Sequence, residues 1–228
     1  MSWKVFGAIV LCQGILAPMA EAGPCGIGTL ASYIALGSAG CTVGSLAFTD
    51  FAFSTVSSSG GAVAVTAAGI TVTPVIVGVK AGLNYASAGF GVTAGQSIQY
   101  LLAYAIDDPP IIHGFELEMF TDSPVFPGFA QIDSLQCVGA VFLGTSCSGT
   151  TVLNSVFDNG ATVSHLDTEF FGPAITVGNR TTITLYATSG GSANFESFNG
   201  LAIVPEPGSF WLMAGSFLLL LSSRYGLR

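Results

Sequence analysis

Long unbroken apolar runs occur in this chain at only two places, its two ends, and this limits what it can fold into more than any other feature. Between the ends, apolar residues are dispersed among Gly, Ser and Thr. Charged side chains make up 8% of the chain, far below the roughly 25% of an average soluble domain. A low charge content without central apolar runs argues against a polytopic membrane protein and favours an exported, β-rich domain.

The few charges are mostly acidic, giving a formal net charge of -8. Between residues 23 and 204 the only basic residues are Lys80 and Arg180. Nucleic-acid binding needs Lys and Arg to neutralise phosphates, and an anionic membrane surface attracts basic clusters. The composition therefore excludes nucleic acid as a partner and gives no electrostatic route to a membrane.

The N-terminal run has the layout of a signal peptide. Lys4 precedes an apolar stretch over Val5–Ala17, and Ala20-Glu21-Ala22 supplies the small-x-small cleavage pattern. The apolar stretch is short for a membrane span, which needs about 20 residues. We expect residues 1–22 to be removed by signal peptidase after Ala22.

The C-terminal run follows a proline-flanked acid. Pro205-Glu206-Pro207 precedes an apolar stretch over Phe210–Leu221, and Arg224 and Arg228 follow it. Prolines forbid helix at the triplet and leave it extended. A helix over residues 208–223 would be about 24 Å long, somewhat under the ~30 Å hydrocarbon core. We expect one short transmembrane helix whose basic end stays cytoplasmic.

This tail resembles the PEP-CTERM sorting signal, also known as the ice-binding protein C-terminal domain. The resemblance covers residues 204–228 and rests on triplet, helix and basic end together, although the two arginines are separated where many members carry a tight cluster. It implies recognition by an exosortase, a membrane transpeptidase that cuts near the triplet. It also implies an inner-membrane anchor before processing, and then the surface or extracellular matrix of a Gram-negative-type bacterium.

Residues 23–203 predict a single all-β domain. Strand patterns rich in β-branched or alternating apolar residues cover residues 69–79, 97–104, 111–119, 181–187 and 193–198, with a Ser/Gly turn at 189–192. Short strands separated by such turns favour a single antiparallel β-sandwich, jelly-roll or Ig-like. One helix is predicted over Leu30–Leu36, with Thr29 as its cap.

Four cysteines remain once the signal peptide, with Cys12, is gone: Cys25, Cys41, Cys137 and Cys147. Four cysteines allow three pairings, and none has the CxxC-type spacing of a zinc site. Loop size favours Cys25–Cys41 and Cys137–Cys147, each closing a short loop. Disulfides agree with export to an oxidising compartment.

The segment around the first cysteines carries a second resemblance. Leu30, Tyr33 and Ile34, followed by Gly40-Cys41, resemble the opening of a group of PEP-CTERM exported proteins. That group also has a later cysteine pair, at the place where Cys137 and Cys147 stand. The resemblance implies no activity and no cofactor.

Catalytic signatures are missing from the sequence. The chain has two histidines, His113 and His165, and no nucleophile elbow, HExxH, P-loop or GxGxxG before a helix. We therefore expect a protein that is not an enzyme.

Two clusters of potential ligands remain. His165, Asp167 and Glu169 share one strand face by period-2 geometry and offer a divalent-ion site, with calcium favoured. The alternative is a solvated outer face opposite Leu166 and Phe170. A second acidic cluster sits across a predicted hairpin, where turn chemistry is the simpler explanation for Asp-Asp-Pro-Pro; its members are Asp107, Asp108, Glu116 and Glu118.

Aromatic residues concentrate in one region, with the members Phe115, Phe120, Phe126 and Phe129. Core packing explains them better than sugar stacking, since sugar platforms prefer Trp and Tyr. The sequence thus predicts an exported, non-enzymatic surface or matrix protein with a structural or adhesive role. Its partners would be signal peptidase, exosortase and exopolysaccharide. A carbohydrate- or calcium-binding surface module is the alternative.

Overall fold

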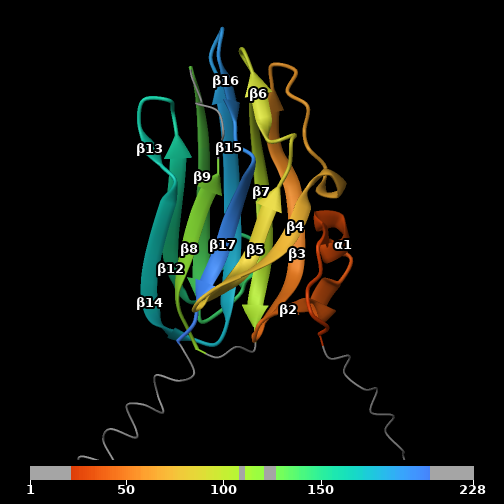
Figure 1. Cartoon of the computed structure of the whole chain (residues 1–228), viewed down its shortest axis with the longest axis vertical. Helices are drawn as coiled ribbons and strands as arrows, with labels where there is room; N and C mark the ends of the chain where they lie inside the picture. The colour runs from red at the N-terminus through yellow and green to blue at the C-terminus, as the bar shows by residue number, and fades with distance from the viewer. Residues whose placement is uncertain (1–21, 108–110, 121–126, 206–228) are drawn as a thin grey trace, which may run out of the picture.

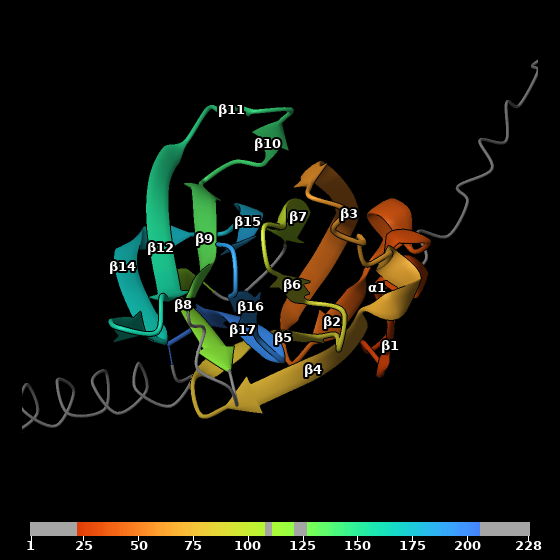
Figure 2. The same cartoon turned by 90° about the horizontal axis from the view of Figure 1, so that it is seen from above.

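A computed structural model describes residues 22–107, 111–120 and 127–205. They form two antiparallel β-sheets packed face to face, as the view from above shows most clearly (Figure 2). The predicted all-β sandwich is confirmed at this level. The predicted signal peptide and sorting signal lie outside the described residues, apart from Ala22, Val204 and Pro205, and the predicted transmembrane helix lies wholly outside them.

Sheet A has seven strands in the order β13 (Val163–Ser164), β12 (Thr150–Asp158), β9 (Gly128–Val138), β15 (Val177–Ala187), β7 (Ser97–Asp107), β3 (Leu46–Ser59) and β2 (Cys41–Val43). Sheet B has six strands in the order β1 (Gly28–Thr29), β4 (Thr71–Val77), β5 (Lys80–Ala86), β17 (Ser197–Ile203), β8 (Ile112–Phe120) and β14 (Leu166–Ala174). Two short ribbons pair β10 (Phe142–Leu143) with β11 (Ser146–Cys147), and β6 (Gly91–Thr93) with β16 (Ser192–Asn194).

The helical elements are short and lie beside the sandwich: α1 (Leu30–Ile34), η1 (Gly37–Ala39) and η2 (Ala67–Gly69). The predicted cap of α1 is confirmed, because Thr29 Oγ1 accepts a hydrogen bond from the Ser32 amide at 3.2 Å. The helix ends at Ile34, two residues before the predicted end.

The predicted strands are found, with two corrections. The last predicted strand, residues 193–198, is two strands, because the chain leaves the β6–β16 ribbon at Asn194 and enters sheet B at Ser197. The predicted hairpin through Asp107 is wrong, since β7 belongs to sheet A and β8 to sheet B. The intervening Asp-Asp-Pro-Pro segment therefore connects two layers and does not turn within one.

Proline within β4 is tolerated for a geometric reason. Pro74 pairs with Leu83 of β5, but the neighbour on the other side, β1, reaches only Thr71 and Val72. At Pro74 the strand is effectively an edge, where a missing amide hydrogen costs no ladder bond.

The sandwich has two ends that differ in their interior. We call the end where Ile203, Lys80 and Val177 lie the base and the opposite end the tip; in Figure 1 the base is at the bottom. Toward the tip the core is aromatic, with the Phe90 ring stacked on Phe195 at 4.7 Å and lying edge-on to Tyr100 at 6.1 Å. All three side chains are buried.

Nearer the base, two adjacent rungs on the inner face of sheet A are polar. The register aligns Asn154, Ser134 and Thr181 in one rung and Gln136, Asn179 and Tyr104 in the next. All six side chains are buried. Most of their polar atoms are hydrogen-bonded inside the protein, whereas Gln136 Oε1 and Asn154 Oδ1 have no hydrogen-bond partner in the described structure.

Asn179 is the centre of this polar layer. Its Nδ2 donates to the Tyr104 hydroxyl at 2.7 Å, and its Oδ1 accepts from Ser134 Oγ at 2.9 Å. Gln136 Nε2 donates to the same Ser134 Oγ at 3.0 Å. A Cβ at Gly200 of sheet B would lie 2.9 Å from the Tyr104 hydroxyl, so glycine there leaves room for the layer.

Candidate functional site

The base is the end of the molecule from which both described termini leave (Figure 1). β17 runs through the middle of sheet B, between β5 and β8, and ends at Ile203. The Val204 amide still donates to the Val79 carbonyl at 2.9 Å. The sandwich therefore holds the chain firmly until Val204, one residue before the Pro205-Glu206-Pro207 triplet.

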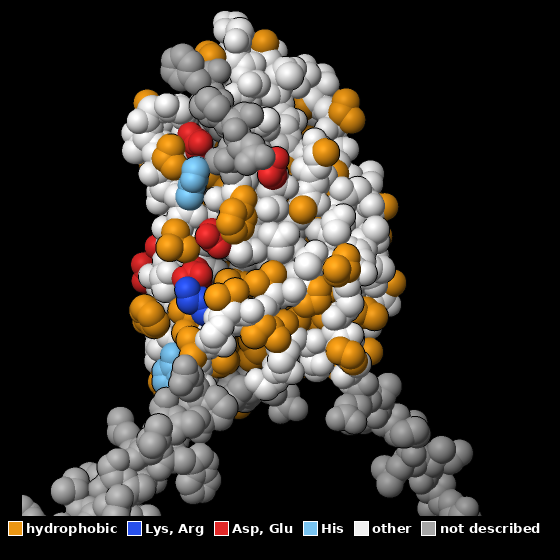
Figure 3. Space-filling model, viewed as in Figure 1, with side chains coloured by type: hydrophobic (Ala, Val, Ile, Leu, Met, Phe, Trp, Pro, Cys, Tyr) orange, Lys and Arg blue, Asp and Glu red, His pale blue; other side chains and the backbone are white. Residues whose placement is uncertain are grey.

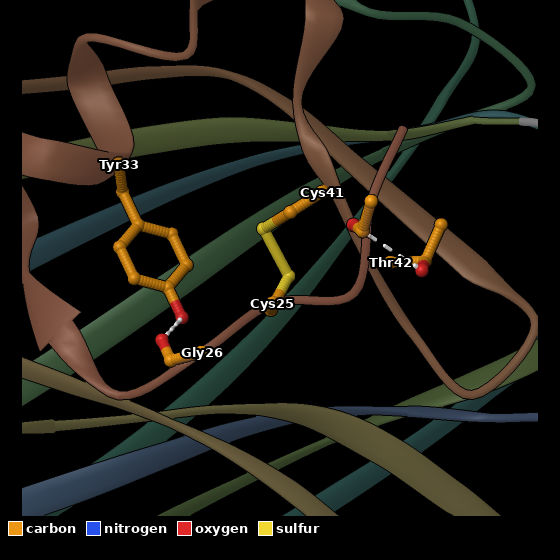
Figure 4. The surroundings of a disulfide bond; sticks show 6 residues. Cys25, Gly26, Tyr33, Cys41 and Thr42 are labelled. Atoms are coloured by element: carbon orange, nitrogen blue, oxygen red, sulfur yellow. Dashed lines mark hydrogen bonds between the residues drawn. A yellow bond between two sulfur atoms is a disulfide. The ribbon is translucent and has the colours of Figure 1, made fainter. Parts of the chain in front are cut away.

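The N-terminal segment is fixed beside β2 by a disulfide (Figure 4). Cys25 bonds Cys41, with their Cα atoms 4.9 Å apart. The Thr42 amide donates to the Gly23 carbonyl at 2.8 Å, and the Cys25 amide donates to the Thr42 carbonyl at the same distance. On the other side of the disulfide, the Tyr33 hydroxyl donates to the Gly26 carbonyl at 2.6 Å. The hydrogen bonds that fix this segment thus reach Gly23, the residue that signal-peptide cleavage is predicted to expose as the new N-terminus.

The second disulfide joins Cys137 to Cys147, with Cα atoms 5.6 Å apart, so both predicted pairings are confirmed. It closes the connection between β9 and β12, in which the β10–β11 ribbon extends away from sheet A (Figure 2). The Gly178 amide donates to the Ala140 carbonyl at 2.9 Å, and Arg180 lies over the Phe142 ring at 5.3 Å. Two disulfides in one small domain indicate an extracellular or periplasmic protein.

Several exposed apolar side chains lie at the base, and others are spread over the rest of the sandwich (Figure 3). Ile76 and Val77, at the end of β4, are 62% and 59% exposed. Ile111, just before β8, and Ile175, just after β14, are also exposed. The register places these residues beside the ends of β17 and β15, around the point where the chain leaves the sandwich.

The predicted sorting motif straddles the limit of the described residues. Pro205 is described and half-buried, while Glu206 and Pro207 lie outside the described part of the chain. Among the described residues no helix has both the length and the hydropathy of a membrane span.

The predicted divalent-ion cluster is not assembled. The Asp167 carboxylate accepts from the Ser155 amide at 2.7 Å, and His165 Nε2 lies 3.5 Å from Asp158. Within the ranges that the structure describes, no three His, Cys, Asp or Glu side chains come together as metal ligands. The alternative fails in its detail too, because Leu166 and Phe170 are exposed and Asp167 faces the neighbouring sheet.

Asp167 instead joins the two sheets along the side of the sandwich where β14 and β12 lie against each other. β14 is the edge strand of sheet B and lies against β12 of sheet A. Asn154 Nδ2 donates to the carbonyls of Asp167 and Phe115 at 3.2 Å each, while the Asp167 carboxylate takes the Ser155 amide. The bonds to the Asp167 carbonyl and from the Ser155 amide cover backbone groups of β14 and β12, where an edge would otherwise leave them unpaired.

The second acidic cluster is divided between two sheets. Asp107 accepts from Thr49 Oγ1 at 3.1 Å in sheet A. Glu116, on β8 of sheet B, is only 6% exposed. Its Oε2 lies 2.5 Å from Nζ of Lys80, which is on β5 of the same sheet. Glu118 accepts from Asn199 Nδ2 at 3.0 Å, and Asp108 lies outside the described residues. Each described carboxylate is thus used to hold strands together.

The predicted aromatic set does not share a face either. Phe115 is fully buried on β8, Phe120 is exposed at the end of the same strand, and Phe129 is half-buried on β9. Phe126 lies outside the described residues. Core packing, the preferred interpretation, is correct for Phe115.

An open groove of about 490 Å³ lies at the tip, between residues 63–65 and the β6–β16 ribbon. Its lining includes Thr93, Gln96 and Asn194 but no aromatic or titratable side chain. Gln96 Oε1 is already used by the Thr93 amide at 3.0 Å. The groove offers hydroxyl and amide groups without stacking surfaces, and carbohydrate binding stays a prediction.

Comparisons with known proteins add little to this geometry. No protein-family model matches the chain, and no curated protein matches its sequence. Among solved structures the chain is similar to TmCBM61 in complex with β-1,4-galactotriose, with 9% identity over 66% of this chain and 86% of that chain and a TM-score of 0.30. At this identity and TM-score the likeness says nothing about what this chain binds.

Proposed function

We propose that this is an exported, non-enzymatic surface or matrix protein, delivered through a PEP-CTERM signal and suited to a structural or adhesive role. The observation that carries the proposal is that the described chain ends at the base, directly after a central strand. β17 is a central strand and ends at Ile203, so a cut near Pro205 removes no described strand. Signal peptidase and an exosortase would cut the chain at two points, and both ends of the described chain lie at the base, next to those points (Figure 1).

The described polar side chains support a structural role. Glu116, Glu118 and Asp167 each bond a residue on another strand and were the groups most suited to chemistry or ion binding. The two disulfides and the low charge content suit a protein that must persist outside the cell.

The sorting part is tested in the native host by replacing Pro205, Glu206 and Pro207 together with alanine. We expect the variant to stay in the membrane fraction with its tail uncut, because the extended recognition segment is gone. The matched control is Ser222→Ala with Ser223→Ala, which alters the tail outside the triplet and should leave processing normal. A triplet variant processed and released like the native protein would refute the sorting proposal.

A further inference from the structure

We propose that the apolar base of the sandwich is a lipid-contacting surface, which seats the domain on the outer face of the membrane while the tail is still attached. The inference rests on the membrane anchoring in the proposed function and goes beyond it by assigning an interaction surface and its partner. The partner is the interface of a lipid bilayer.

The surface itself is built from four aliphatic side chains on three separate segments. They are Ile76, Val77, Ile111 and Ile175, with exposures of 62%, 59%, 42% and 66%. β-branched side chains on strand ends and tight connections lose little rotamer freedom on binding. Side chains of this kind, clustered on one end of a domain, mark a binding surface more than a random exposure does.

The position of the tail selects the bilayer as the partner. Residues 205–209 separate Val204 from the apolar stretch that begins at Phe210, so a fully extended linker spans at most about 20 Å. Once Phe210–Leu221 is in the membrane, the base cannot move farther than this from the lipid surface. Such a short tether gives an effective concentration high enough for a weak apolar contact to form.

The charges near the base indicate what kind of contact this is. Lys80 is engaged with Glu116, Asp107 accepts from Thr49, and Asp50 is exposed. This balance gives no attraction to anionic lipid headgroups. The contact must therefore be apolar, and it should be insensitive to ionic strength.

The tip provides an internal reference for a test. Val63 lies at the opposite end of the sandwich, is also aliphatic and β-branched, and is 85% exposed against 62% for Ile76. A probe at Val63 measures the quenching of an exposed position far from the proposed lipid contact. Probes at Ile76 and Ile175 measure the quenching at the base, on two different segments.

The experiment uses residues 23–228, the chain that signal-peptide cleavage is predicted to leave and that lacks Cys12, in phosphatidylcholine vesicles that contain a nitroxide-labelled lipid. Single variants Ile76→Cys, Ile175→Cys and Val63→Cys are labelled with an environment-sensitive fluorophore, since the four native cysteines of the domain are paired. We expect several-fold stronger quenching at both base positions than at Val63, unchanged between low and high salt. Adding Val77→Asp should reduce quenching at position 175, whereas Val63→Asp should not.

Flotation of the same vesicles separates the two levels of the proposal. A chain that floats but shows equal quenching at base and tip would overturn the docking surface and leave the anchor intact. A chain that does not float would overturn both. Quenching that disappears at high salt would also contradict an apolar lipid contact. So would base labels that are equally shielded from water when no lipid is present, because a second copy of the protein would then cover the base.

Discussion

In the tip half of the sandwich the interior is aromatic and the turns are rich in Ser, Gly and Asn, whereas the base half combines the polar rungs with a second aromatic cluster of Tyr33, Phe48, Phe51 and Tyr104. Aliphatic side chains are exposed on the outside of the base. Phe90, Phe195 and Tyr100 fill the tip, and Asn179 and Ser134 occupy the equivalent layer toward the base. The tip has the ordinary arrangement of a soluble domain. The base adds the hydrogen bonds of its polar rungs and the two disulfides to a hydrophobic core, and it also exposes aliphatic side chains such as Ile76 and Val77.

The sharpest way to test the tip half is Phe90→Ala. Phe90 is 1% exposed and stacked on Phe195, so its loss should lower the free energy of unfolding by about 3–5 kcal/mol. Urea denaturation measures the loss. The control, Ile76→Ala at the exposed base, should change stability by no more than about 0.5 kcal/mol. Comparable losses at both sites would erase the contrast between the halves.

Removing the N-terminal disulfide with Cys25→Ser and Cys41→Ser tests how the base is held. The crosslinked residues are 16 apart, and the chain-entropy model gives a loss of about 3 kcal/mol. Removing Cys137–Cys147, 10 apart, should cost slightly less because its loop is shorter. Melting curves of the two double variants under the same oxidising conditions make the comparison, and an unchanged midpoint in both would show that neither crosslink limits unfolding.

The polar layer is tested by Asn179→Ala. The change removes the donor to the Tyr104 hydroxyl and the acceptor for Ser134, and leaving such buried groups unpaired costs about 1–3 kcal/mol. Thr182→Ala, on the outer face of the same strand, is the matched control and should stay within about 0.5 kcal/mol. A neutral or stabilising Asn179→Ala would mean that the polar rungs do not hold the base together.

The smallest expected effect is an alkaline loss of stability. Burial raises the pKa of the Tyr104 hydroxyl. Burial also raises the pKa of Tyr85, and the neighbouring Tyr104 and Tyr33 act in the same direction. The unfolded chain loses these protons above its ordinary pKa of about 10, while the folded protein keeps them. Stability should therefore be intact at pH 8 and fall by about 1 kcal/mol per tyrosine near pH 10.5. Urea denaturation at both pH values, with Tyr104→Phe reducing the fall, checks this; full tyrosine ionisation without any loss would contradict it.

The sequence predicted the sheets and the crosslinks because these follow from local patterns. Alternation identified β7 and β15, Thr29 marked the start of α1, and loop length selected both disulfides. Period-2 alternation also placed His165, Asp167 and Glu169 on one face, but it does not say what that face meets.

The partners of the polar side chains could not be predicted from the sequence, because they depend on which distant strands pair and which faces become buried. β14 became an edge facing β12, so Asp167 was used to join the sheets. The polar rungs were missed for a related reason. In β15 polar residues occupy both faces around Asn179 and Thr181, and only the finished sandwich shows which face is buried. The Lys80–Glu116 pair, 36 residues apart, likewise depends on the placement of β5 and β8 on either side of β17.

The most direct test of the whole account is the intact mass of the native, secreted protein, measured with and without reduction. We expect a chain that starts at Gly23 and ends near the Pro205-Glu206-Pro207 triplet, and whose mass rises by four hydrogens on reduction as both disulfides open. A mass that still includes Phe210–Leu221, or one that does not change on reduction, would contradict the proposal that this is an exported, crosslinked domain between two removable ends.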